Sequence, residues 1–269
     1  MLYKYLPYER VDVLQNLKIR FSPLKSLNDP FENLPLIDLK EEREQLHFEL
    51  ISGIDEFWSK AKQEDQTESN KLLLEKVKKE LIENIKEKTE FNSVGKRLID
   101  LLGDNFGVLS LSRTEKSLLM WSHYADEGHG FVIGFDDKHS FFKQRDMKGE
   151  ITKPIPVTYS SKRRTIISNE DKYYQKLLCE KPLEWSYEEE ERLFRTFLTK
   201  QNPMGKDRYN QDIVLSGFPK EAIKEVILGY GMPESNKEVI LKAILTNEIT
   251  CNVKSSSMSD EEYKLVFKG

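Results

Sequence analysis

Hydrophobic and polar positions along the first part of the chain follow short, alternating patterns. The segment "MLYKY" predicts a strand, "YERVDVLQNLK" a short helix, and "IRFSP" a second strand that ends at Pro23. The next segment, "SLNDPFENLP", predicts an ordered turn, because Asn and Asp before Pro30 favour non-helical backbone and can bond neighbouring amides. Residues 1–37 therefore read as strand, helix and strand.

Residues 38–102 change to helical spacing. Leu73, Val77, Leu81 and Ile85 recur every four residues, and Lys and Glu cover the other faces. This pattern predicts two antiparallel helices, followed by a shorter helix through "GKRLIDLL". We interpret the segment as a helical insertion or lid near the N-terminus, and its charge runs as solvated helix faces.

From Phe106 onward the pattern indicates strands separated by helices. The segments "FGVLSLS", "GFVIGF" and "PIPVTYS" predict strands, whereas "EKSLLMWSHY" predicts a helix that Thr114 can cap. Gly128 and Gly130 allow a tight chain reversal before "FVIGF". The segment "NEDKYYQKLLCEK" predicts a further helix, and the C-terminal part reads as strand, helix, strand and strand. We expect one α+β domain over residues 1–269, with a mixed, mainly antiparallel sheet and flanking helices.

Composition narrows the class of protein. The chain has a net charge of −4, a sequence pI near 5.8 and 33% charged residues, so its net charge does not indicate nucleic-acid binding. No apolar run approaches the length of a signal peptide core or a membrane span. The two cysteines, Cys179 and Cys251, have no CxxC spacing, which predicts reduced thiols, a cytoplasmic protein and no metal site.

The segment "EWSYEEEERLF" admits two interpretations. As the start of a helix, Ser186 would be the N-cap and Glu189 would close a capping box. As a strand, alternation would place Glu188, Glu190 and Arg192 on one face. The second arrangement would be a polar ladder that folding alone rarely requires.

Aromatic and polar side chains also gather in "MWSHYA". Trp121 and Tyr124 fall at helical spacing with Met120, so core packing explains them as well as a ligand contact does. His123 lies off that face. We consider His123 and Tyr124 as candidate site residues, with Trp121 beside them.

The order of these segments resembles a known family. The segments "LYKY", "LKIRFSPLKSLNDPFE", "VLSLSRTEKSLLMWSHYADEGHGFVIGFD", "EWSYEEEERLF" and "FPKEAIKEVILG" are similar to the bacterial and phage family called domain of unknown function twenty-nine seventy-one. The layout also resembles that of ADP-ribosyltransferases. Those enzymes use an N-terminal strand, a Ser- or Tyr-bearing middle strand and a late strand that carries a glutamate, often as Glu-x-Glu.

This second resemblance implies an ADP-ribosyltransferase-like fold and NAD as a substrate, with no metal. "LYKY" and "IRFS" would supply the first element, Ser110 and Ser112 the second, and Glu188-x-Glu190 the third. Many such enzymes have a histidine on the first strand, and here Lys4 or Arg20 would take its place. The expected catalytic residues are Glu190, Glu188, His123 and Tyr124. The expected ligand-binding residues are Tyr3, Lys4, Tyr5, Arg20, Ser22, Asn28, Asp29, Ser112, Trp121 and Arg192.

Three functions are compatible with these residues. The first is an NAD-using ADP-ribosyltransferase or NAD glycohydrolase, in a toxin or in phage defence, with a small nucleotide ligand and an unassigned macromolecular acceptor. The second is a non-catalytic module that senses a ligand or binds a partner protein through the same polar cleft. The third is a nucleic-acid-processing enzyme that uses Asp29, Glu188 and Glu190 around a divalent metal ion.

Overall fold

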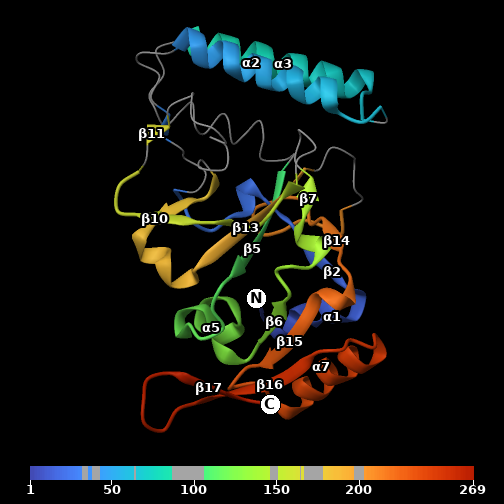
Figure 1. Cartoon of the computed structure of the whole chain (residues 1–269), viewed down its shortest axis with the longest axis vertical. Coiled ribbons are helices and arrows are strands. Elements are labelled where there is room, and N and C mark those ends of the chain that lie inside the picture. Colours follow the sequence, from blue (N-terminus) through green and yellow to red (C-terminus); the bar gives the residue numbers. More distant parts are fainter. Residues whose placement is uncertain are drawn as a thin grey trace.

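The computed structural model describes residues 1–31, 36–37, 43–63, 65–86, 106–145, 151–163, 165–166, 178–196 and 203–269 (Figure 1). Nine strands of this part of the chain form the main sheet, in the order β17-β16-β15-β6-β1-β5-β13-β9, with β3 also pairing with β5. Their bounds are β1 (Leu2–Leu6), β3 (Ser22–Pro23), β5 (Phe106–Ser112), β6 (Phe131–Phe135), β9 (Ile155–Pro156), β13 (Glu190–Thr196), β15 (Ile223–Leu228), β16 (Asn252–Met258) and β17 (Leu265–Lys268).

Within this sheet the pair β15–β16 is parallel and the other pairs are antiparallel. Four smaller pairs of strands lie apart from it. They are β10 (Thr158–Ser160) with β12 (Glu180–Pro182), β11 (Thr165–Ile166) with β4 (Leu36–Ile37), β14 (Leu215–Gly217) with β2 (Lys18–Arg20), and β7 (Gln144–Arg145) with β8 (Ile151–Thr152). The predicted mixed, mainly antiparallel α+β fold is confirmed.

The described helices are α1 (Asp12–Asn16), α2 (Arg43–Lys60), α3 (Glu68–Lys86), α5 (Leu118–Tyr124) and α7 (Glu234–Thr246). Short 3-10 turns are η1 (Tyr8–Val11), η2 (Leu24–Ser26), η3 (Asp126–Gly128), η4 (Ser140–Phe142), η5 (Leu183–Glu188) and η6 (Lys220–Ala222). Among the described residues, no helix has both the length and the apolar character that crossing a membrane requires.

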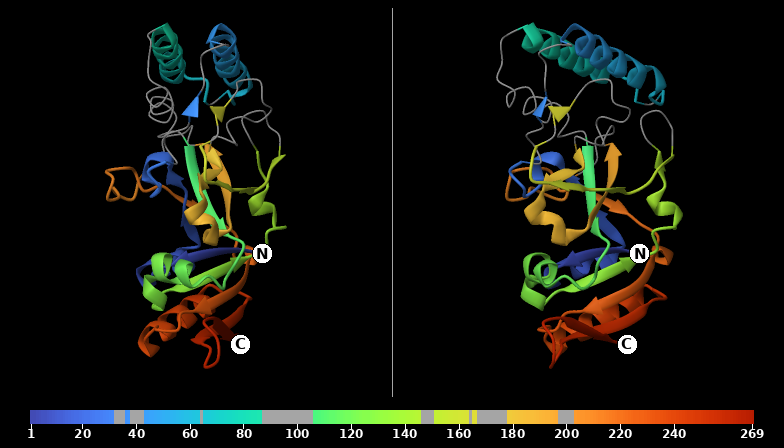
Figure 2. Two further views of the ribbon diagram at one scale, coloured as in Figure 1. Left: turned by 90° about the vertical axis from the view of Figure 1, so that its left-hand side faces the viewer. Right: turned by 60° about the vertical axis from the view of Figure 1, so that its left-hand side comes forward.

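Helices α2 and α3 lie side by side beyond one end of the main sheet (Figure 2). Lys78 on α3 bonds Asp55 on α2 at 2.5 Å, which joins the two helices through their charged faces. The two long helices expected in residues 38–102 are therefore present. The shorter helix expected at "GKRLIDLL" lies outside the described residues, and the role of the segment as an insertion or lid stays a prediction.

Strand β6 forms the centre of the core because every residue of "FVIGF" is buried. Phe131 and Ile133 pack in one apolar cluster with side chains of α1 and α7. Val132 points to the opposite cluster, which includes Met120 and Trp121 of α5. A continuous apolar strand is what a sheet covered on both faces requires.

The chain reversal before β6 depends on glycine. Gly128 has a φ of +85°, a region that glycine enters without steric cost. A Cβ atom on Gly130 would lie 2.2 Å from the backbone oxygen of Leu6 on the neighbouring strand β1. The two glycines therefore let the turn close directly against the sheet, as the sequence predicts.

Three local predictions need correction. Helix α5 begins after Ser117, whose side chain accepts a hydrogen bond from the backbone N–H of Met120 at 3.4 Å, so Thr114 is not the cap. The expected strand "IRFSP" is divided, because β2 pairs with β14 and β3 pairs with β5. Most of the helix expected at 169–181 lies outside the described residues, and its last two residues belong to strand β12.

The main sheet opens between β1 and β5. Strand β1 pairs with β6 along its whole length but pairs with β5 only at Tyr3 and Ser112. Strands that meet at one position diverge beyond it, which leaves space for side chains between them. This opening positions the candidate site.

Candidate functional site

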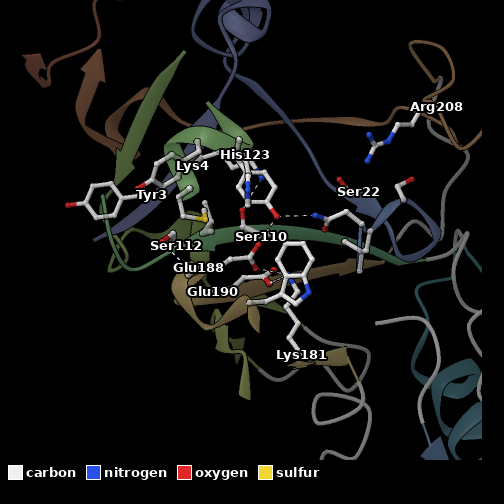
Figure 3. A pocket seen from close by; sticks show the side chains of 18 residues that line it. Tyr3, Lys4, Ser22, Ser110, Ser112, His123, Lys181, Glu188, Glu190 and Arg208 are labelled. Atoms are coloured by element: carbon white, nitrogen blue, oxygen red, sulfur yellow. Dashed lines mark hydrogen bonds and ion pairs between the residues drawn. The ribbon is translucent and has the colours of Figure 1, made fainter. Parts of the chain in front are cut away.

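A cavity of about 560 Å³ lies at the opening between β1 and β5 (Figure 3). Residues of α5, β12, η5, the start of β13, residues 22–28 and Arg208 complete its wall. The expected site residues that line it are Tyr3, Lys4, Tyr5, Ser22, Asn28, Ser112, His123, Tyr124, Glu188 and Glu190. Tertiary structure thus brings together side chains from four distant parts of the sequence.

Strand register aligns three of these residues across the sheet. Tyr3 on β1 is opposite Ser112 on β5, and Ser112 is opposite Glu190 on β13. Arg192 is opposite Ser110 in the same way, two residues along both strands. Because residues two apart on a strand share a face, Glu190 and Arg192 lie on one side of β13.

The helical interpretation of Glu188 to Arg192 is wrong. The 3-10 turn η5 ends at Glu188, Glu189 adopts a left-handed conformation with φ 43°, and β13 begins at Glu190. The strand interpretation holds from Glu190 onward, and Ser186 caps no helix here. Glu188 reaches the same cavity from the turn that precedes the strand.

Lys181 on β12 holds the two carboxylates together. Its Nζ atom lies 2.7 Å from Glu188 Oε2 and 2.7 Å from Glu190 Oε2. All three side chains are 4% exposed. Burial raises the pKa of Glu190, and the charge of Lys181 opposes this shift. The positive charge of Lys181 therefore offsets the negative charge of two carboxylates that are shielded from water.

Arg192 supports Glu190 from behind. Its Nε and Nη2 atoms donate to the two oxygens of Glu190 at 2.9 and 3.0 Å, and Nη1 donates to the backbone oxygen of Leu178. The side chain is 1% exposed and does not line the cavity. Arg192 thus orients a carboxylate, whereas the sequence analysis expects it to bind the ligand.

A second chain of hydrogen bonds orients Glu188. Tyr124 donates to Glu188 Oε1 at 2.6 Å, and Asn28 Nδ2 donates to the Tyr124 hydroxyl at 3.0 Å. Burial and then the charge of Glu188 raise the pKa of Tyr124, so this phenol stays protonated and remains a donor. His123 Nδ1 lies 2.9 Å from the hydroxyl of Tyr187 at the surface. The catalytic roles of His123 and Tyr124 stay predictions.

Lys4 reaches the cavity from β1. Its Nζ atom donates to the backbone oxygen of Ser110 at 3.0 Å, and among the described residues it makes no ion pair. Burial lowers the pKa of Lys4 to about 8. The amine is therefore a cation whose charge changes near neutral pH.

Replacing Lys4 by Met is expected to remove a pH dependence of stability. Between about pH 8 and pH 10.4 the unfolded chain binds a proton at Lys4 that the folded chain has released. As pH increases across that window, the wild type should therefore gain stability that the variant does not gain. The difference between their free energies of unfolding, wild type minus Lys4→Met, should increase by about 1–3 kcal/mol. Urea unfolding at pH 7.5 and pH 10 measures this difference, and a flat or falling difference would contradict it.

Several expected ligand contacts are instead part of the supporting structure. Trp121 is fully buried, does not line the cavity, and donates from Nε1 to the backbone oxygen of Glu115 at 2.8 Å. Arg20 binds Asp207 at 2.6 Å and also lies outside the cavity wall. Asp29 is 1% exposed and accepts a bond from the backbone N–H of Phe31.

The tyrosines of β1 are also less available than the sequence implies. Tyr3 and Tyr5 touch the cavity but are 7% and 4% exposed, and both pack in the cluster around Trp121. The hydroxyl of Tyr5 donates to the backbone oxygen of Thr114 at 2.9 Å. Little ring surface remains for stacking on a base.

Several residues that line the cavity are not among those the sequence predicts. Lys181, Trp185 and Arg208 carry the chemistry that matters most here. Lys181 belongs to a short strand whose neighbours carry no periodic signal, and Arg208 lies in a loop. One sequence signal points to Lys181 and Trp185: the motif "KPLEW" places a lysine and a tryptophan just before the four glutamates.

The fold and the cavity define an α+β protein with a buried ion-pair cluster at an opening in its sheet. Residues 120–193, from α5 to β13, match the model of a family described as a protein of unknown function, DUF2971. Over this segment the match supports the family resemblance that the sequence predicts, and the segment includes Tyr124, Lys181, Glu188 and Glu190. Comparisons with curated proteins and with solved structures found no match.

Proposed function

We propose that the protein cleaves the nicotinamide–ribose bond of NAD, as an ADP-ribosyltransferase or an NAD glycohydrolase. One observation carries the proposal: Tyr3, Ser112 and Glu190 are aligned on three neighbouring strands beside the cavity, with a second carboxylate next to Glu190. This is the order of N-terminal strand, serine strand and glutamate strand that the resemblance implies. The cavity volume of about 560 Å³ is also within the range of small-molecule sites.

The chemistry requires a fixed negative charge near the ribose. When the bond from the ribose to the nicotinamide nitrogen breaks, the electron pair leaves with neutral nicotinamide and positive charge develops on the sugar. A preorganised carboxylate stabilises that charge in the transition state. We assign this role to Glu190, with Glu188 beside it to accept a hydrogen bond from a ribose hydroxyl. Water or a hydroxyl or amine of an acceptor then attacks the sugar carbon and loses its proton.

Substituting Glu190 by Gln tests the proposal. Incubation with NAD labelled in nicotinamide should show release of the label by the wild type, and Glu190→Gln should reduce the rate by about 100- to 1000-fold, because the developing charge loses its partner. Candidate acceptor proteins are included, since a transferase needs one.

The matched control is Glu189→Gln. Glu189 precedes Glu190 directly, but its side chain is exposed and does not line the cavity. This variant should release nicotinamide at the wild-type rate. Absence of NAD binding and of nicotinamide release by the wild type, with acceptors present, would overturn the proposal.

A non-catalytic ligand-sensing module is the second candidate. It is favoured by the ion pairs of Glu190, because Arg192 and Lys181 together engage both of its oxygens and balance its charge. In that case NAD or a related nucleotide would bind without turnover. If the wild type releases nicotinamide and Glu190→Gln does not, the non-catalytic module is excluded.

The metal-dependent alternative receives less support. Among the described residues, no group of three or more His, Cys, Asp or Glu side chains is placed to hold one metal ion. Lys181 lies between Glu188 and Glu190, and Asp29 is outside the cavity wall.

An NAD-consuming activity would suit a cytoplasmic toxin or phage-defence effector, which is the setting we propose.

A further inference from the structure

Arg208 lies at the mouth of the cavity, apart from the carboxylates. It lines the cavity from the loop between β13 and β14, and Figure 3 shows it well separated from Glu188 and Glu190. Its side chain is exposed. The cavity wall therefore carries carboxylates in one region and a guanidinium in another.

Asp207, the preceding residue, anchors this loop to the rest of the protein. Its Oδ2 accepts hydrogen bonds from Arg20 Nη2 and from Ser26 Oγ, each at 2.6 Å. Its Oδ1 accepts from the backbone N–H groups of Tyr209 and Gln211 at 2.8 and 2.9 Å. One carboxylate thus joins the loop to β2 and η2, and it shapes the loop on both sides of Arg208.

The guanidinium of Arg208 retains donors for a ligand. Nη2 donates to the hydroxyl of Tyr209 at 2.8 Å, and the guanidinium carbon lies 4.7 Å from the centre of the Tyr209 ring. Among the described residues, Arg208 makes no ion pair with a carboxylate. An arginine stacked on its neighbour is restricted in orientation while its remaining N–H groups stay open to solvent.

The charges of the cavity wall favour an anionic ligand. Lys181 forms ion pairs with Glu188 and Glu190, whereas Lys4 and Arg208 form no ion pair among the described residues. The negative charges of Glu190 and Glu188 act on Lys4, so Arg208 is the cation of the wall that lies apart from the carboxylates. A planar guanidinium matches the oxygens of a phosphate group in a bidentate manner.

We propose that Arg208 binds a phosphate group of the ligand and that Asp207 is its positioning residue. The proposal deepens the proposed function and rests on it, because the phosphates of NAD would meet Arg208 while the nicotinamide ribose meets Glu190. A ligand that spans the cavity would then be held by opposite charges at its two ends. Arg208 would select phosphorylated nucleotides over nucleosides.

Binding of ADP and of adenosine to the full chain, measured by calorimetry, tests this inference. The wild type should bind ADP more tightly than adenosine. Arg208→Gln should weaken ADP binding about tenfold, the effect expected for one charge-assisted contact, and leave adenosine binding unchanged. Asp207→Asn should weaken ADP binding in the same direction, because a neutral amide has one acceptor oxygen and cannot accept all the hydrogen bonds that Asp207 accepts on its two oxygens.

Lys206→Gln is the matched control. It removes the same charge two residues away, from a side chain that pairs with Asp212 and does not line the cavity. Its ADP affinity should stay within about twofold of the wild type, since exposed ion pairs contribute little. Thermal unfolding of each variant shows that the fold is retained, and the exposed Arg208 is not required for packing.

The inference is overturned if the wild type binds adenosine as tightly as ADP or fails to bind ADP. It is also overturned if Arg208→Gln binds ADP like the wild type, or if Lys206→Gln loses as much affinity. Nicotinamide release is measured separately. Arg208-dependent ADP binding without NAD cleavage would leave this inference standing and remove the proposed catalytic function.

Discussion

Replacing Lys181 by Met is expected to lower the free energy of unfolding by about 3–5 kcal/mol, because it leaves two buried carboxylates without their shared cation. The methionine conserves most of the side-chain volume, so lost packing contributes little. Among the residues that the structure describes, Glu190 keeps Arg192, whereas Glu188 keeps the hydroxyl of Tyr124 alone. Urea unfolding at pH 7 measures the effect.

The pH dependence of this loss identifies its cause. Without Lys181 the pKa of Glu190 should rise further in the folded protein, because burial still raises it and one of the charges that opposes this shift is gone. A group whose folded pKa is raised binds more protons in the folded state, so it stabilises the fold at low pH and loses that contribution as pH rises. The deficit of Lys181→Met should therefore shrink between pH 7 and pH 5.

Lys60→Met serves as the control for the loss of a lysine. Lys60 pairs with Glu56 on the exposed surface of α2, with both side chains more than 40% exposed. The change should alter the free energy of unfolding by no more than about 0.5 kcal/mol. A loss for Lys181→Met that is equally small, or one that does not vary with pH, would contradict the buried-pair interpretation.

Trp121→Ala is expected to destabilise the protein by about 3–5 kcal/mol, since a fully buried indole would leave a large cavity. The ring of Tyr5 packs edge-on against Trp121 with 5.5 Å between centres, and Tyr230 lies 6.4 Å away. The variant also leaves the backbone oxygen of Glu115 without its indole donor. Thermal and urea unfolding measure the loss.

Leu119→Ala is the matched control on the same helix. Leu119 is 48% exposed, so its truncation should cost less than about 1 kcal/mol. If Trp121→Ala unfolded at the same urea concentration as the wild type but lost ligand affinity, Trp121 would be a binding residue and our assignment to the core would be wrong.

Local patterns in the sequence predict much of the fold. The apolar run "FVIGF" identifies the central strand, because a strand buried on both faces cannot alternate. Helical spacing identifies α2 and α3, and two glycines identify the turn before β6. These features depend on residues close in sequence. Short-range periodicity and backbone preference are therefore sufficient to predict them.

Local patterns predict the site less completely. The alternation of Glu190 and Arg192 is correct, but it does not reveal that Arg192 points into the protein and binds Glu190. The aromatic spacing of Trp121 and Tyr124 is equally compatible with a core and with a ligand contact. Trp121 is buried against Tyr5 of β1, whereas Tyr124 lines the cavity and donates to Glu188 of η5.

Local sequence patterns identify the central strand, the two long helices and most of the polar residues from which a site could form. Which of these residues meet depends on how the strands pair. Lys181 lies between Glu188 and Glu190 because β12, η5 and β13 converge, and Arg208 reaches the cavity because Asp207 ties its loop to Arg20 and Ser26. The physical reason is that periodicity encodes which face of an element is buried. Distances between residues far apart in sequence depend on strand pairing and register.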